Sequence, residues 1–100
     1  MLNIKKTNEN QTALLTPVGR LDTTTAPELE NVIKESLPGI TELILDFAGL
    51  EYISSAGLRV LLSAQKAIKA QGTMKIRNVN DVVMEIFDMT GFSDILTIEA

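Results

Sequence analysis

The segment Leu43-Ile44-Leu45-Asp46-Phe47, followed by a short loop and then by Ser54-Ser55-Ala56-Gly57, is the most informative part of this 100-residue chain. Its apolar run predicts a buried β-strand, and the amphipathic residues after Gly57 predict a helix that begins at the two serines. Backbone N–H groups at a helix N-terminus are unpaired, and the macrodipole is positive there. The position therefore suits a phosphate, whether bound or covalently attached.

Composition and charge indicate one globular domain over residues 1–100. Apolar residues make up 45% of the chain and charged residues 22%, a balance typical of folded proteins. The formal net charge is −4 and no run of Lys or Arg occurs, so we expect no nucleic-acid partner. No apolar stretch approaches the roughly 18 residues of a membrane span, and the first residues lack a signal-peptide core. We expect a cytoplasmic protein without direct membrane insertion.

The chain contains neither cysteine nor histidine. It therefore lacks thiol chemistry, disulfides, and the commonest general base and metal ligand. A nucleophile with two carboxylates can be drawn from Ser55, Asp22 and Asp46, but no His or Lys base is implied beside the serine. The glycine pattern also matches no phosphate-cradling loop. We therefore expect that the protein is not an enzyme and that it has no catalytic residue, no metal site and no cofactor.

The first half of the chain predicts a hairpin and a helix. Alternating apolar residues in Leu2–Ile4 and in Thr12–Val18 predict two strands that pair across a polar turn. Thr25 and Glu28 fit a capping box at the start of a helix, and Pro38-Gly39 ends that helix.

The second half predicts alternating strands and helices. The nearly continuous apolar core of the strand over 42–47 is typical of a strand covered on both faces. A helix is expected over about residues 55–71, with Gly72 in a left-handed conformation after it. The remaining expected elements are a strand over 74–79, a helix capped by Asn80 and ended by Gly91, and a strand over 95–98. On that last helix, we expect Phe87 in the core and Met84 and Met89 as core and rim filling.

The resulting order, ββαβαβαβ, predicts an α/β fold with a mixed, mostly parallel sheet of about five strands and three or four helices. Loops that leave parallel strands gather at one edge of a sheet, so Asp22, Asp46 and Ser55 are expected to share one end of the molecule. Structural roles compete with this: Asp22 as a turn or capping residue, Asp46 as a cap of its own loop, and Gly57 as a site of close helix packing. For Ser54 and Ser55 the structural alternative is a simple N-cap.

Three separate motifs stand out: Gly19–Asp22, Leu45–Phe47 together with Leu50 and Tyr52–Leu58, and Ile86–Phe92. Together they resemble a bacterial STAS domain of the anti-sigma factor antagonist family, and the resemblance covers essentially the whole chain. It implies a single STAS domain that binds an anti-sigma factor and so releases a sigma factor for transcription. The resemblance further implies that the anti-sigma factor is a serine kinase, which phosphorylates the antagonist, and that a serine phosphatase restores it.

The resemblance also assigns residues. It makes Ser55 the phosphorylated serine, whereas Ser54 stands where Asp is usual and Ala56 where a second hydroxyl residue is usual. Ser54 is thus a second candidate acceptor, and Arg59, where Gly is frequent, can pair with a phosphate on Ser55. The expected partner-binding residues are Asp22, Thr23, Asp46, Ser54, Ser55, Ala56, Gly57 and Arg59.

The unusual neighbours of Ser55 leave an alternative open. Single STAS domains also serve, without phosphorylation, as interaction modules in transporter or signalling complexes. In either role we expect a monomer when free, because no heptad pattern is present.

Overall fold

A mixed five-stranded sheet forms the centre of the protein in this computed structural model, which describes residues 2–99. The strand order is β1-β2-β3-β5, and β4 pairs with β2. The β1–β2 pair is antiparallel and every other pair is parallel, as expected for an initial hairpin followed by crossovers. The strands are β1 (Asn3–Glu9), β2 (Thr12–Leu21), β3 (Glu42–Asp46), β4 (Leu50–Ile53) and β5 (Thr73–Arg77).

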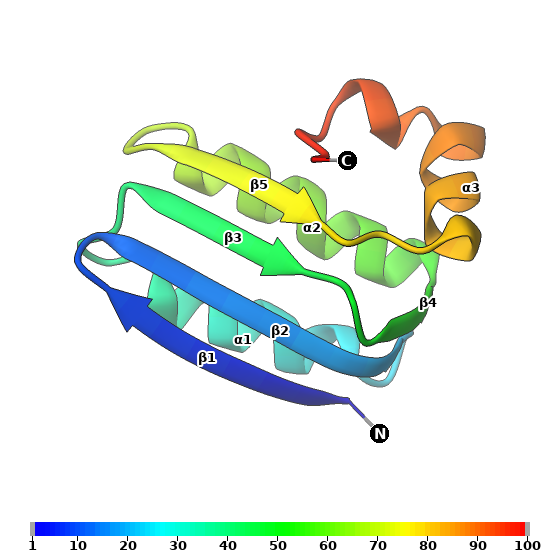
Figure 1. Cartoon of the computed structure of the whole chain (residues 1–100), viewed down its shortest axis with the longest axis horizontal. Coiled ribbons are helices and arrows are strands. Elements are labelled where there is room, and N and C mark those ends of the chain that lie inside the picture. Colours follow the sequence, from blue (N-terminus) through cyan, green and yellow to red (C-terminus); the bar gives the residue numbers. More distant parts are fainter. Residues whose placement is uncertain (1, 100) are drawn as a thin grey trace.

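Two helices lie side by side across one face of this sheet (Figure 1). They are α1 (Ala26–Ser36) and α2 (Ser55–Ile68). A third helix, α3 (Asp81–Thr90), stands at the end of the sheet against β4 and is followed by a 3-10 turn, η1 (Phe92–Asp94). The predicted α/β class, five-stranded mixed sheet and three helices are therefore confirmed.

The element order is ββαββαβα, which differs from the predicted order in two places. Residues 50–53 were expected in a loop but form β4, because β2 extends past the end of β3 and offers its last residues to a second parallel partner. The expected last strand over 95–98 is only an isolated bridge between Ile76 and Ile98.

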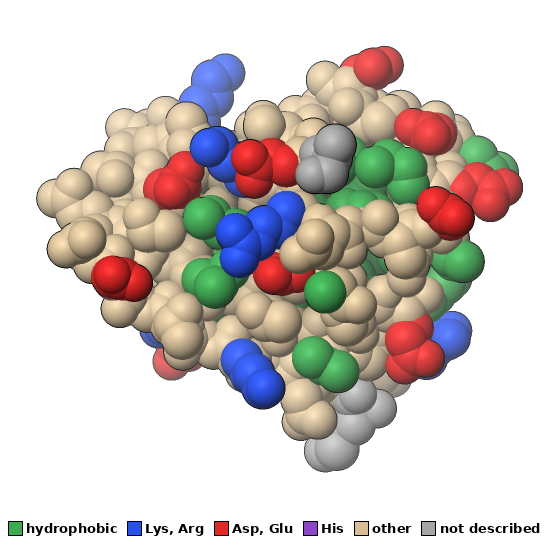
Figure 2. All heavy atoms as spheres, viewed as in Figure 1, with side chains coloured by type: hydrophobic (Ala, Val, Ile, Leu, Met, Phe, Trp, Pro, Cys, Tyr) green, Lys and Arg blue, Asp and Glu red, His purple; other side chains and the backbone are tan. Residues whose placement is uncertain are grey.

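The sheet is covered by helices on one face only, so the prediction of a two-sided cover for β3 is wrong. Leu43 and Leu45 are fully buried under the helices, whereas Ile44 is only partly buried on the opposite face. That open face carries ion pairs and a few hydrophobic side chains (Figure 2). The apolar run therefore combines core residues with one outward-facing residue.

Two helix-end signals are confirmed in atomic detail. The Asn80 side chain accepts a hydrogen bond from the Val83 N–H at 2.8 Å and so caps α3. Gly91 ends α3 in the left-handed conformation, with φ 81°.

Two other helix-end predictions are wrong. Thr25 precedes α1 but makes no capping hydrogen bond to it, because its Oγ1 accepts from the Asp22 N–H and donates to Arg20 O, both at 2.8 Å. Gly72 does not adopt a positive φ. A Cβ at Gly72 would lie 1.8 Å from Thr41 O, so close backbone approach requires this glycine.

Candidate functional site

The ends of β2 and β4 bring the Asp22 loop and the start of α2 together. Leu21 and Ile53 are register partners, and the Ser54 N–H donates to Leu21 O at 2.8 Å. Asp22 follows directly after Leu21, and Ser55 directly after Ser54. These two segments therefore lie next to each other, as the sequence predicted.

Ser55 is the first residue of α2 and is exposed. The first helical hydrogen bond runs from Leu58 N–H to Ser54 O at 3.0 Å, so the three amides before Leu58 have no helical partner. The first turn of α2 contains no acidic residue, and Ser54 supplies no side-chain cap. The positive end of the helix is thus uncompensated, an arrangement that favours a phosphate at this position.

The neighbouring serine has a different environment. Ser54 is the extended N-cap residue of α2, with φ −98° and ψ 177°. Its Oγ is buried and has no hydrogen-bond partner within the part of the chain that the structure describes. Only Ser55 therefore presents an accessible hydroxyl at the helix start.

Gly57 holds the first turn of α2 close to the sheet. A Cβ at this residue would lie 2.7 Å from Leu21 Cγ and 2.8 Å from Ile53 Cγ1. The expectation of close helix packing at Gly57 is confirmed. Ala56 packs partly against the core, and Arg59 is exposed one turn after Ser55, on the same side of the helix.

The Asp22 carboxylate organises the loop before α1. Its Oδ1 accepts hydrogen bonds from Thr24 Oγ1 at 2.7 Å and from the N–H groups of Thr24 and Thr25 at 3.0 and 3.1 Å. The hydroxyl of Thr24 lowers the pKa of Asp22 most, and these N–H groups lower it further against the opposing effect of partial burial. Asp22 therefore acts as a turn residue, while Thr23 beside it is exposed.

Asp46 lies away from this loop pair. β2 and β3 pair through Leu15 and Leu45, and β2 continues for six residues to Leu21. At about 3.3 Å per residue, Asp46 is roughly 20 Å along the sheet from Asp22. The predicted common end for Asp22, Asp46 and Ser55 is thus wrong for Asp46.

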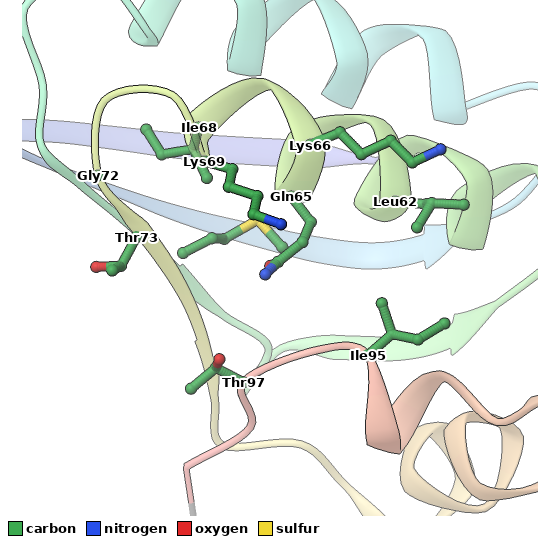
Figure 3. A pocket seen from close by; sticks show the side chains of 10 residues that line it. Leu62, Gln65, Lys66, Ile68, Lys69, Gly72, Thr73, Ile95 and Thr97 are labelled. Atoms are coloured by element: carbon green, nitrogen blue, oxygen red, sulfur yellow. The ribbon is translucent and has the colours of Figure 1, made fainter.

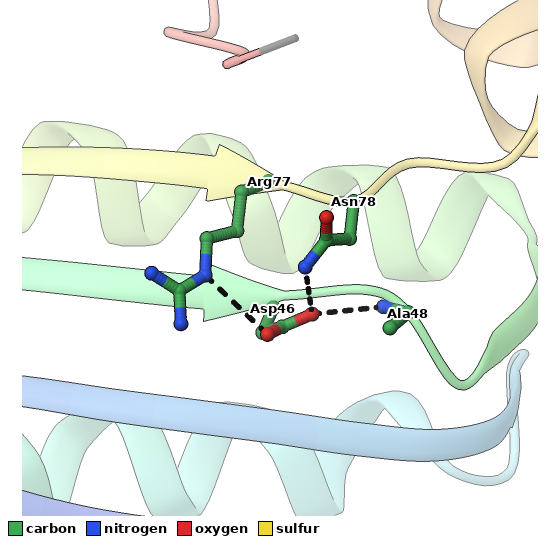
Figure 4. A network of polar contacts seen from close by, with 4 residues as sticks. All are labelled: Asp46, Ala48, Arg77 and Asn78. Carbon is green, nitrogen blue, oxygen red and sulfur yellow. Dashed lines mark hydrogen bonds and ion pairs between the residues drawn. The ribbon is translucent and has the colours of Figure 1, made fainter.

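Asp46 instead links two strands and a loop (Figure 4). Its Oδ2 accepts from Arg77 Nε at 3.3 Å, and its Oδ1 accepts from Asn78 Nδ2 and the Ala48 N–H, both at 3.0 Å. Partial burial alone would raise the pKa of Asp46, but these hydrogen bonds and the guanidinium charge hold the pKa below its ordinary value. The carboxylate caps its own loop, as the structural alternative proposed.

The sequence patterns missed two features near the helix start. Arg20 stacks on Tyr52, with its Cζ 4.6 Å from the ring centroid, and each of the two lies two residues before a site segment. On α3, Val82 is 54% exposed and Met89 is 79% exposed, so the prediction that Met89 fills the rim of the core is wrong. The spacing of seven residues between Val82 and Met89 was the available signal for a second, outward-facing apolar stripe.

That stripe lies at the same end of the molecule as Ser55. Both α2 and α3 contact β4, and Asn80 Nδ2 donates to Leu50 O at 2.8 Å. Hydrophobic side chains gather over α3 in Figure 2. Acidic residues border them, namely Asp81, Glu85 and Asp88.

Neither a metal site nor a membrane-spanning helix is found among the described residues. No group of three or more His, Cys, Asp or Glu side chains within residues 2–99 is arranged to hold a metal ion. Over the same range, every helix is too short or too polar to span a bilayer.

Sequence comparison identifies a family and several relatives of this chain. The family described as STAS domain matches residues 3–100. The chain is 30% identical over 96 residues to the anti-sigma-B factor antagonist of Bacillus subtilis, covering 95% of this chain and 87% of that protein. It is 28% identical over 97 residues to the anti-sigma-B factor antagonist of Staphylococcus aureus, covering 95% and 90%.

Solved structures share the fold. An anti-sigma factor antagonist from Mycobacterium paratuberculosis superposes with a TM-score of 0.90 at 17% identity, covering 98% of this chain and 85% of that chain. The antagonist SpoIIAA in its unphosphorylated form gives a TM-score of 0.82 at 17% identity, covering 100% and 89%. Its phosphorylated form, from Bacillus, gives 0.74 at 16% identity, covering 100% and 92%.

Proposed function

Because this chain belongs to the STAS domain family of anti-sigma factor antagonists, we propose that it binds an anti-sigma factor with serine kinase activity and thereby releases a sigma factor. Phosphorylation of Ser55 by that kinase ends binding, and a serine phosphatase restores it. The protein acts as a cytoplasmic monomer and catalyses no reaction. The single observation that carries the proposal is the exposed Ser55 hydroxyl at an uncompensated helix N-terminus.

The choice of Ser55 over Ser54 rests on accessibility. A kinase must reach the hydroxyl oxygen, and Ser54 Oγ is buried whereas Ser55 is exposed. We therefore propose Ser55 alone as the phosphate acceptor.

The proposed partner surface surrounds Ser55. It comprises the Asp22-Thr23 loop, the start of α2 from Ser54 to Gly57, and Arg59. The exposed apolar stripe of Val82 and Met89 on α3 extends it, since burying such side chains on a partner is favourable. Asp46 is not part of this surface, because its carboxylate is bound by Arg77 and Asn78 at the end of β5.

A phosphate at Ser55 should prevent partner binding without unfolding the protein, because of its charge and bulk. A phosphoserine adds about −1.5 to −2 charges, and the unpaired amides of α2 stabilise a charge there by about 0.3–1 kcal/mol. Arg59 lies within reach as a further favourable charge. The fold is therefore retained, whereas a partner packed over the loop must desolvate the phosphate and loses affinity.

Phosphosite mapping is the direct test. The protein is isolated from its own host in growing and in stressed cells, and phosphate is located by mass spectrometry. We expect phosphate on Ser55 with an occupancy that changes between conditions. A Ser55→Asp variant should fold normally and lose the copurifying anti-sigma factor, while Ser63→Asp, an exposed serine on the same helix, serves as the matched control.

An unphosphorylated interaction module in a transporter or signalling complex is the second candidate. It is favoured by Ser54 and Ala56, which depart from the usual residues beside the acceptor. Absence of phosphate in every condition, together with stable copurification of a membrane complex, would select this alternative. Ser55 would then be only the first residue of the helix.

A further inference from the structure

A groove on the far part of α2 forms a second surface, separate from the Ser55 end. It lies between α2, the start of β5 and the segment after η1, with a volume of about 400 Å³ (Figure 3). Gln65 in the groove is ten residues after Ser55, which is about 15 Å along the helix axis. Apolar lining comes from Leu62, Ile68, Met74 and Ile95.

Three polar side chains of α2 line this groove and have unmet hydrogen-bond or ion-pair capacity among residues 2–99. Gln65 Oε1 is buried and accepts no hydrogen bond from the described residues, which is unfavourable unless a partner supplies one. Lys66 and Lys69 line the groove and form no ion pair within residues 2–99. In Figure 3, Gln65 and Lys69 point into the space and Ile95 points toward it from the opposite side. The groove is thus apolar, positively charged and short of a hydrogen-bond donor.

The floor of the groove includes the edge of β5 at Met74, a residue that is only 2% exposed. The Ile76 N–H donates to Thr97 O at 2.9 Å, and the Glu99 N–H donates to Ile76 O at 2.8 Å, so the backbone of Ile76 faces away from β3. Residues two apart in a strand point their backbone groups in the same direction. The N–H and C=O of Met74 therefore face the same edge, upstream of the only bridge that the C-terminal segment makes among the described residues.

We propose that this groove binds an extended peptide segment of a partner protein that carries apolar and acidic side chains. The segment lies in the groove along α2 and contacts the side chains that line it. Its apolar side chains pack on Leu62 and Ile95, and its carboxylates pair with Lys66 and Lys69. Its backbone or amide N–H groups satisfy Gln65. The inference goes beyond the proposed function, because it uses no residue of the Ser55 surface.

Peptide selection on the full chain tests the proposal. A phage-displayed library of random short peptides is selected against the wild type and against a Lys66→Glu/Lys69→Glu variant. We expect acidic and apolar sequences on the wild type and basic sequences on the variant. Wild-type-selected peptides should bind the variant about tenfold more weakly, since two exposed ion pairs together approach that factor.

Matched variants locate the binding. Lys5→Glu/Lys6→Glu makes the same charge change on β1, where both lysines are exposed, and should leave affinity unchanged. Ile95→Asp should abolish binding without unfolding the protein, because Ile95 is 47% exposed. Amide shifts measured by NMR should centre on Lys69, on Ile95 and on the side-chain amide of Gln65.

Other outcomes would overturn the proposal. Selected peptides without acidic bias, equal affinity for the groove and β1 charge variants, or amide shifts centred on Ser55 would each do so. Self-association of the wild type that Ile95→Asp removes would assign the groove to a second copy instead. None of these results bears on phosphorylation of Ser55, so the two proposals fail separately.

Discussion

Replacing Gly72 by Ala tests whether close backbone approach, instead of backbone conformation, requires this glycine. A Cβ there would lie 1.8 Å from Thr41 O and 2.5 Å from Thr41 C. Both obstructing atoms belong to the backbone, so no side-chain rotation relieves the contact. The Thr73 N–H also donates to Thr41 O at 3.0 Å, which fixes the separation of the two chains.

The expected cost follows from that geometry. Carbon–oxygen contacts normally lie at about 3.3–3.6 Å, so the chains must separate by more than an ångström. Such a shift breaks the Thr73 hydrogen bond, at about 1 kcal/mol, and strains the packing at the start of β5 by about 1–3 kcal/mol. The reduced entropy of the unfolded alanine chain returns about 0.4–1 kcal/mol. We therefore expect Gly72→Ala to lower the free energy of unfolding by about 2–3 kcal/mol.

Gly39→Ala is the matched control. Gly39 has φ +82° and no atom within 4 Å of its Cβ position, so it carries conformational strain without a clash. We expect this change to cost only about 1 kcal/mol, the left-handed penalty less the same entropy gain. Urea unfolding of the two variants and the wild type, at equal m-values, measures the difference. Equal losses for both variants, or a smaller loss for Gly72→Ala, would refute the steric explanation.

Three further expectations can be checked by equilibrium unfolding. Asn80→Ala should cost about 1–2 kcal/mol, because it removes the cap on Val83 N–H and the bond to Leu50 O; exposed Asn31→Ala is its control. The pKa of Asp46 is lower in the folded state than in the unfolded chain, so ionised Asp46 contributes its full stabilisation when the pH is above the unfolded-state pKa of about 3.9. This contribution is lost as the pH falls through the lower folded-state pKa. Asp46→Asn should therefore be less stable than wild type at pH 7, with a difference that shrinks toward pH 2; a constant difference would contradict this. Met89→Ser should change stability by less than about 0.5 kcal/mol, since its side chain is 79% exposed, and a large loss would restore Met89 to the core.

Signals contained within a few residues predicted the structure well. The Asn80 cap and the left-handed Gly91 need only their own helix, and the hairpin needs only two adjacent strands. Thr25 shows where local reasoning fails. Its sequence context fits a capping box, but in the folded loop its Oγ1 accepts from the Asp22 N–H at 2.8 Å instead of from a helix N–H.

Features that depend on the relative lengths of distant strands could not be predicted. β4 forms because β2 is longer than β3 and pairs through its last residues with a second strand. A register shift between Gly19 and Arg20 disturbs the alternation of side chains along β2. Because of this extra length, the end of β2 lies beside Ser54, whereas Asp46 at the end of β3 pairs with residues at the end of β5. The motif identified Ser55 correctly as a residue at the helix start, but the burial of the Ser54 hydroxyl arises from packing that no sequence period encodes.

Replacement of the usual acidic neighbour by Ser54 changes what a phosphate at Ser55 would experience. A carboxylate beside the acceptor would repel the phosphate and already neutralise part of the helix terminus. Here the first turn of α2 has no acidic residue, and Arg59 adds a positive charge on the same side. With about +0.5 charge at the helix terminus and the positive charge of Arg59, a phosphate of about −1.5 to −2 charges would cancel or slightly exceed the local positive charge. A partner that contacts this helix start through a carboxylate would consequently be attracted before modification and would lose that attraction after it, whereas an acidic neighbour would already weaken the attraction in the unmodified state.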